Sequence, residues 1–126
     1  SSVRPKAPGM KYRHYAPKAE LTIVEGEENR VVETVNGWIR EKEALGLRCG
    51  VIATDETAGL YRAETVMSMG SREDEESIAR HLFDVLRRFD FLDVACIYSE
   101  SFHTPRMGQA IMNRLLKAAG HRVIRV

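Results

Sequence analysis

From Glu20 onward the chain alternates between short, continuous apolar runs and longer segments with a helical apolar period. The apolar runs predict strands at 21–24, 49–53, 63–69, 94–98 and 123–126. Strands that are apolar on both faces are typical of a parallel sheet that helices cover on both sides. The pattern therefore predicts an α/β fold: a Rossmann-like three-layer domain with about five mostly parallel strands and three main helices.

Three helices are predicted around these strands. Apolar residues recur at i, i+1, i+4, i+7 and i+8 over 31–39, and Gly46 is placed to end this first helix. Ser71 and Asp74 form an S-x-x-D capping pattern for a second helix, which has an acidic first turn and a basic end. The third helix is predicted over 108–119. The core face of the second helix is predicted to contain Ile78, Ala79, Leu82, Phe83, Leu86 and Phe89.

Composition limits the chain to one domain of ordinary size. Its 126 residues are 44% apolar and 29% charged, which suits a globular domain with a core of its own. No apolar run is long enough for a membrane span or a secretory leader, so we expect a cytoplasmic protein that does not bind membranes. Cys49 and Cys96 lie in apolar runs without a CxxC motif, and we interpret both as reduced, structural residues. We interpret Met67, Met69, Met107 and Met112 as core residues.

Residues 1–19 differ from the rest of the chain in charge. They contain five bases and no acid, whereas the remaining residues contain 14 bases and 18 acids. The prolines of this segment favour an extended chain, and Gly9 permits one bend. We therefore predict an extended basic arm over 1–19 and a Rossmann-like domain over 20–126. The cations of the arm and its tyrosines at 12 and 15 suit a strip that closes over a nucleotide or a charged amino acid. The composition of the arm equally fits a solvated linker.

The loops at the carboxyl ends of the predicted strands offer little chemistry. Ligands of open α/β sheets bind outside these ends, which here means the loops at 25–29, 54–60, 70–74 and 99–106. None contains a GxGxxG or GxxxxGK[ST] motif, and the acidic loops would repel phosphate, so we expect a poor stand-alone nucleotide binder. Ser101 and His103 could form the nucleophile and base of a hydrolase, but proximity in the chain does not provide triad geometry, and we interpret His103 as a solvated loop residue. No catalytic residue and no metal ligand is assigned.

Two segments carry a resemblance to a known family. The sequence APGMKYRHYAP at 7–17 resembles the linker motif of the two-domain threonylcarbamoyl-AMP synthases, the long form of the YrdC-like family. The helix QAIMNRLLKAA at 109–119 is similar to the AxMNRLxKAA segment near the carboxyl end of the same proteins. The resemblance covers essentially the whole chain, and it implies a linker followed by a Rossmann-like accessory domain, with the YrdC-like catalytic domain expected upstream.

The resemblance also implies a function. The family is a nucleotidyltransferase that makes threonylcarbamoyl-AMP from L-threonine, bicarbonate and ATP, with Mg²⁺ accompanying ATP, for threonylcarbamoyladenosine modification of tRNA. The linker crosses the mouth of the catalytic cleft, and the residues carried over as contacts nearest ATP and threonine are Lys11, Tyr12, Arg13, His14 and Tyr15. Such a lid would exclude water from a hydrolysis-prone intermediate.

The implied role is that of an accessory and lid domain whose partner is its own upstream catalytic domain. The fragment alone is expected to be inactive, to hold no cofactor of its own and to bind no nucleic acid directly. The alternative is a regulatory module that binds a protein or a ligand and has no part in the active site. Two positions depart from the family pattern: Ala7 replaces an expected small hydroxyl residue before Pro8, and the loop at 102–107 replaces an expected acidic, glycine-rich loop.

Overall fold

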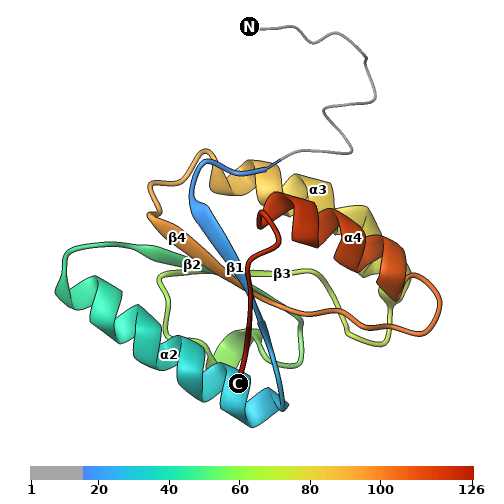
Figure 1. Cartoon of the computed structure of the whole chain (residues 1–126), viewed down its shortest axis with the longest axis horizontal. Helices are drawn as coiled ribbons and strands as arrows, with labels where there is room; N and C mark the ends of the chain where they lie inside the picture. Colours follow the sequence, from blue (N-terminus) through green and yellow to red (C-terminus); the bar gives the residue numbers. More distant parts are fainter. Residues whose placement is uncertain (1–15) are drawn as a thin grey trace, which may run out of the picture.

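In the computed structural model, which describes residues 16–126, five strands form one sheet in the order β3-β2-β4-β1-β5, and every pairing is parallel (Figure 1). Two helices cover one face of the sheet and one helix covers the other. The predicted α/β three-layer fold is therefore confirmed. The strands are β1 (Glu20–Glu25), β2 (Cys49–Ala53), β3 (Thr65–Ser68), β4 (Cys96–Glu100) and β5 (Val123–Arg125).

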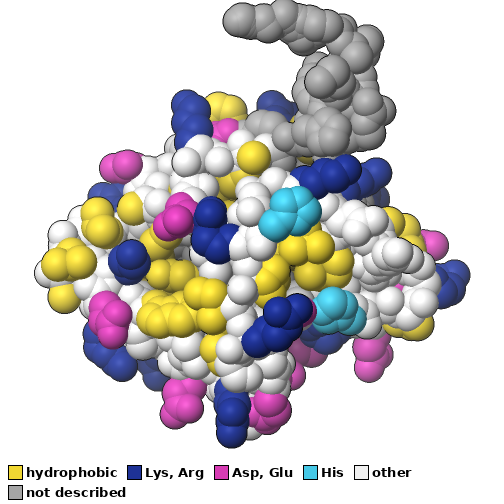
Figure 2. All heavy atoms as spheres, viewed as in Figure 1, with side chains coloured by type: hydrophobic (Ala, Val, Ile, Leu, Met, Phe, Trp, Pro, Cys, Tyr) yellow, Lys and Arg dark blue, Asp and Glu magenta, His cyan; other side chains and the backbone are white. Residues whose placement is uncertain are grey.

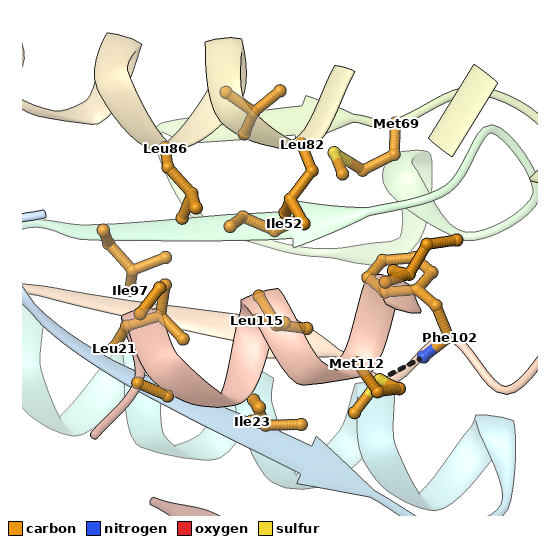
Figure 3. Close-up of a cluster of buried hydrophobic side chains, with 14 of the residues drawn as sticks. Leu21, Ile23, Ile52, Met69, Leu82, Leu86, Ile97, Phe102, Met112 and Leu115 are labelled. Atoms are coloured by element: carbon orange, nitrogen blue, oxygen red, sulfur yellow. Dashed lines mark hydrogen bonds between the residues drawn. The ribbon is translucent and has the colours of Figure 1, made fainter. Parts of the chain in front are cut away.

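Each face of the sheet has its own hydrophobic core. Helices α3 (Glu75–Phe89) and α4 (Gly108–Ala118) pack on one face, and their buried residues join Leu21, Ile23 and others from the strands (Figure 3). Helix α2 (Glu28–Ala44) packs on the opposite face, together with the segment around the short helix η1 (Ala58–Leu60). Because neighbouring residues of a strand point to opposite faces, Ile23 and Val24 enter different cores, which explains the continuous apolar runs.

Helix α3 begins later than its sequence suggests. Asp74 is the N-cap, since its carboxylate accepts a hydrogen bond from the Ser77 N–H at 3.1 Å. The prediction that Ser71 caps this helix is therefore wrong, because the Ser71 hydroxyl instead donates to Glu56 at 2.6 Å. The core face of α3 also includes Val85, which the predicted set omitted, whereas the predicted core residue Phe83 is only half-buried and belongs to neither core.

Strand β4 lies two residues further along the chain than predicted. Its pairing starts at Cys96, which is opposite Glu20 of β1 and Cys49 of β2, and it continues to Glu100. The shift places Glu100 inside a buried strand instead of in a loop. The two cysteines are free and buried, and their Sγ atoms lie 3.3 Å apart. The four methionines predicted for the core all pack in or against the core on the α3 and α4 face.

The start of the described chain is attached at the amino ends of the strands. Pro17 is buried, and the Lys18 N–H donates to Asp90 Oδ1 at 2.9 Å, directly after α3. The predicted lid residues Lys11, Tyr12, Arg13, His14 and Tyr15 lie outside the described residues. Over residues 16–126, no helix combines the length and the apolar character needed to cross a membrane.

Basic and acidic side chains are interspersed over the face that Figure 2 shows. Apolar side chains are exposed between α2 and β5, where a shallow groove of about 400 Å³ is lined by Trp38, Tyr98 and Ile124 among others. The rings of Trp38 and Tyr98 lie 5.4 Å apart between centroids. This groove is distinct from the strand ends, where polar side chains converge.

Candidate functional site

The topology creates a crevice between the carboxyl ends of β1 and β4. These strands are neighbours, but the chain leaves β1 into α2 on one face of the sheet and leaves β4 toward α4 on the other face. Ligands of open α/β sheets bind where adjacent connections diverge in this way. A cavity of about 230 Å³ lies there, lined by Val24, Gly26, Glu28, Val31, Arg72, Glu100 and Ser101.

The floor of this crevice contains a buried carboxylate. Glu100 is 6% exposed, and its Oε2 accepts hydrogen bonds from the hydroxyl groups of Thr57 and Tyr61, both at 2.5 Å. Its Oε1 accepts from Arg72 Nη2 at 2.7 Å. A buried carboxylate is tolerated only when it is paired and hydrogen-bonded, and here both oxygens have donors. Burial and the bond to Glu100 raise the pKa of Tyr61, so its phenol stays protonated and donates.

Arg72 is held on three sides and remains partly open to the cavity. Besides its ion pair with Glu100, its Nη1 donates to the Ser101 carbonyl at 2.9 Å. Its guanidinium also lies 5.3 Å from the centroid of the Phe102 ring, a cation–π contact. The side chain is still 38% exposed. A guanidinium has five N–H donors, so Arg72 can bind a further acceptor without releasing Glu100.

A second carboxylate fixes the loop that leads to α4. Glu75, in the first turn of α3, accepts hydrogen bonds from Arg106 Nε at 2.8 Å and from the N–H groups of Arg106 and Met107 at 3.1 and 2.8 Å. The neighbouring Thr104 hydroxyl and these donors lower the pKa of Glu75 to about 2. The loop is further anchored by Phe102, which is fully buried and donates its N–H to Met112 Sδ (Figure 3).

A third carboxylate connects the loops after β2 and β3. Glu56 accepts from the Ser71 hydroxyl at 2.6 Å and from the Arg72 N–H at 2.9 Å, and these bonds lower its pKa to about 2. The Ser68 hydroxyl donates to Asp55 in the same region. Three carboxylates, those of Glu56, Glu75 and Glu100, therefore hold the strand-end loops in fixed positions around the crevice.

The predicted position of His103 in an exposed loop is confirmed, and its bonding does not support a hydrolase. The imidazole is 65% exposed, and its Nε2 lies 3.0 Å from Glu25 Oε1. Arg125 also approaches the Glu25 carboxylate, at 3.8 Å. Within the described part of the chain, no hydrogen bond joins His103 to the Ser101 hydroxyl that the hydrolase alternative requires.

Sequence reasoning missed the central residues of this site. Glu100 was assigned to a loop, and Arg72 and Tyr61 were not singled out. The available signal was a carboxylate that directly follows an apolar strand, at the edge of the sheet where ligands bind. Among residues 16–126, no group of three or more His, Cys, Asp or Glu side chains is arranged to hold a metal ion.

Comparison with known sequences identifies the family. Residues 1–120 match the family described as the C-terminal domain of threonylcarbamoyl-AMP synthase. The chain belongs to this family. It is 49% identical over 122 residues to the threonylcarbamoyl-AMP synthase of Bacillus subtilis (strain 168), and 43% identical over 121 residues to that of Pyrococcus abyssi (strain GE5 / Orsay). These matches cover 97% and 96% of the chain but only 34% of each relative, so the chain spans about a third of their length.

Solved structures of threonylcarbamoyl-AMP synthases of the Sua5 type have the same fold. P. abyssi Sua5, in a crystal structure with L-threonine, matches with a TM-score of 0.79 and 41% identity over 100% of this chain and 36% of its own. The C-terminal Sua5 domain from Pyrococcus horikoshii matches with a TM-score of 0.69 and 29% identity, covering 88% of this chain and 100% of its own. The latter is a structure of this domain on its own.

Proposed function

We propose that this threonylcarbamoyl-AMP synthase C-terminal domain serves as the accessory and lid portion of an enzyme that forms threonylcarbamoyl-AMP. The enzyme would use L-threonine, bicarbonate and ATP with Mg²⁺, would release pyrophosphate, and would supply threonylcarbamoyladenosine modification of tRNA. The catalytic YrdC-like domain would lie upstream in the same protein. The domain itself supplies no turnover.

The observation that supports this role is that the family match begins at residue 1 and so includes the basic arm. The arm therefore lies within the unit that the family model matches. The relative from P. abyssi was solved with L-threonine, the proposed amino acid substrate. We propose that Lys11 and Arg13 donate to the anionic groups of the reacting ligands, and that the rings of Tyr12 and Tyr15 and the imidazole of His14 cover them.

The two cysteines bear on the cellular setting that we propose for this enzyme. The two cysteines are free although their Sγ atoms lie 3.3 Å apart, and free thiols are typical of reducing compartments. We propose a cytoplasmic enzyme, where ATP, L-threonine and tRNA are available together.

The test is pyrophosphate release that depends on ATP, L-threonine and bicarbonate, measured on the full reading frame, on its Tyr12→Ala/Arg13→Ala variant and on the present chain alone. We expect activity in the full protein, a loss of at least about tenfold in kcat/KM in the variant, and none in the isolated chain. A matched control is Arg4→Ala/Lys6→Ala, which removes two arm cations outside the PGMKYRHYAP segment.

The control separates recognition by the motif from the effect of positive charge. If kcat/KM falls by the same factor in both variants, the arm acts only through its positive charge. If neither loses activity, the arm is a tether, and the lid role is refuted in favour of a regulatory module.

A further inference from the structure

We propose that the crevice between the carboxyl ends of β1 and β4 binds a small free α-amino acid as its zwitterion. The site would belong to the accessory domain itself, on residues other than those of the arm. It therefore does not depend on the lid role proposed above.

A cation and an anion with side chains free to bind a ligand, Arg72 and Glu28, both line the cavity. Arg72 uses two of its donors for Glu100 and the Ser101 carbonyl, and it keeps 38% of its side chain exposed. Glu28, in the first turn of α2, is exposed, and its side chain makes no hydrogen bond or ion pair with the described residues. A zwitterion can therefore place its carboxylate on Arg72 and its ammonium group on Glu28.

The same cavity is unsuited to phosphate. Its charged lining consists of Glu28, Glu100 and Arg72, which sum to a net negative charge. The amino end of α2, a common phosphate site, is already capped by the Glu27 carboxylate, which accepts from the Arg30 N–H at 3.2 Å. A purely anionic ligand would meet two carboxylates and a helix end that is already capped.

The backbone at the end of β1 is also closed to a pyrophosphate. A Cβ placed on Gly26 would lie 2.6 Å from the Val126 carbonyl oxygen, so Val126, which follows β5, already packs against this glycine. Close approach of a pyrophosphate to glycine backbone, which dinucleotide sites require, is therefore blocked here.

The size of the cavity limits the ligand. Its volume of about 230 Å³ is smaller than the pockets of roughly 300–1,000 Å³ that enclose drug-sized molecules and cofactors. Val24 and Val31 contribute an apolar wall, which suits a short aliphatic side chain beside the two charges. A small amino acid matches this combination of size, charge and apolar surface.

The test is an NMR titration of the isolated ¹⁵N-labelled chain, because the homologous domain from P. horikoshii has a structure of its own. The probes are glycine, L-alanine, L-threonine and L-leucine, with methylammonium and acetate as half-ligands. We expect saturable shifts of the Gly26, Val31 and Ser101 amide signals with at least one amino acid. Each half-ligand should bind at least about tenfold more weakly, because it engages one charge only.

A matched pair of variants tests the assignment of the ammonium contact. Glu28→Gln should weaken binding at least about tenfold, whereas Glu33→Gln makes the same change on an exposed residue of α2 outside the cavity and should have no effect. Thermal unfolding of both variants verifies that they are folded. The proposal is overturned if no amino acid gives saturable shifts up to about 10 mM, if acetate alone binds as tightly, or if the two variants bind equally well.

Discussion

Replacing Gly50 with alanine should destabilise the domain, because β2 packs directly against α3 at this point. A Cβ on Gly50 would lie 2.2 Å from Phe89 Cε1 and 2.9 Å from Cζ. Phe89 is 1% exposed, so its ring has no route into solvent. Forcing an extra methyl group into a close-packed core costs about 1–3 kcal/mol. Loss of glycine's freedom in the unfolded chain offsets about 0.4–1 kcal/mol of this. A 2.2 Å contact with a fully buried ring calls for the upper end of this cost, so the expected net loss of unfolding free energy is about 2–2.6 kcal/mol.

Urea unfolding of the isolated chain, followed by circular dichroism, measures this loss. Gly37→Ala is the matched control. Gly37 lies within α2, and apart from the nearby backbone of that helix no atom lies within 4 Å of the position that a Cβ would take. The control should stabilise the domain by about 0.5–1 kcal/mol. Adding Phe89→Leu to Gly50→Ala should cost less than the sum of the two single changes, since the smaller side chain provides space. A Gly50→Ala protein as stable as the parent, or strictly additive costs, would refute this account of the packing.

Three further outcomes follow from the buried polar groups. The pKa of Glu75 is lowered from 4.5 to about 2, so its stabilising bonds are complete above about pH 5 and are lost as the pH falls toward 2. The difference in unfolding free energy between the parent and Glu75→Gln should therefore shrink in unfolding experiments taken from pH 7 to pH 3. Tyr61→Phe removes one donor from the buried Glu100 carboxylate and should lower the free energy of unfolding in urea by about 1–3 kcal/mol. An unfolding free energy equal to that of the parent would contradict the hydrogen bond. Burial and the adjacent Cys96 thiol raise the pKa of Cys49 to about 12, so iodoacetamide at pH 8 should label Cys49 slowly in the folded chain and rapidly in denaturant, as measured by peptide mass.

The layered fold was predictable from the sequence because it depends on local patterns. Continuous apolar runs such as 49–53 report burial on both faces of a strand, and helical periodicity reports one buried stripe. The position of β4 was not predictable, since its start is set by pairing with β1 and β2 and not by the apolar character of 94–98.

The centre of the crevice was missed for a related reason. A glutamate is unfavourable in a buried strand, and local propensity therefore placed Glu100 in a loop. What makes its burial possible is the set of donors from Thr57, Tyr61 and Arg72, which lie 28 or more residues away in the chain. Residues that are far apart in sequence and converge only in the folded state leave no periodic signal. The exposed position of His103, by contrast, followed from its loop alone and is confirmed.

Strand β1 and helix α3 both run between the described start of the chain at 17–18, which is the root of the arm, and the end of the sheet that contains the crevice. The arm leaves the domain at the amino ends of the strands, where Lys18 bonds to Asp90, and the crevice lies at the opposite end of β1, roughly 17 Å away for a strand of this length. Helix α3 spans this distance, because Asp90 follows its last turn and Glu75 in its first turn holds the end of the loop that continues from Glu100 and Ser101 of the crevice. Its core residues are almost fully buried, so the helix cannot slide without opening the hydrophobic core. The described start of the chain at 17–18 is therefore held in a fixed position at the amino ends of the strands.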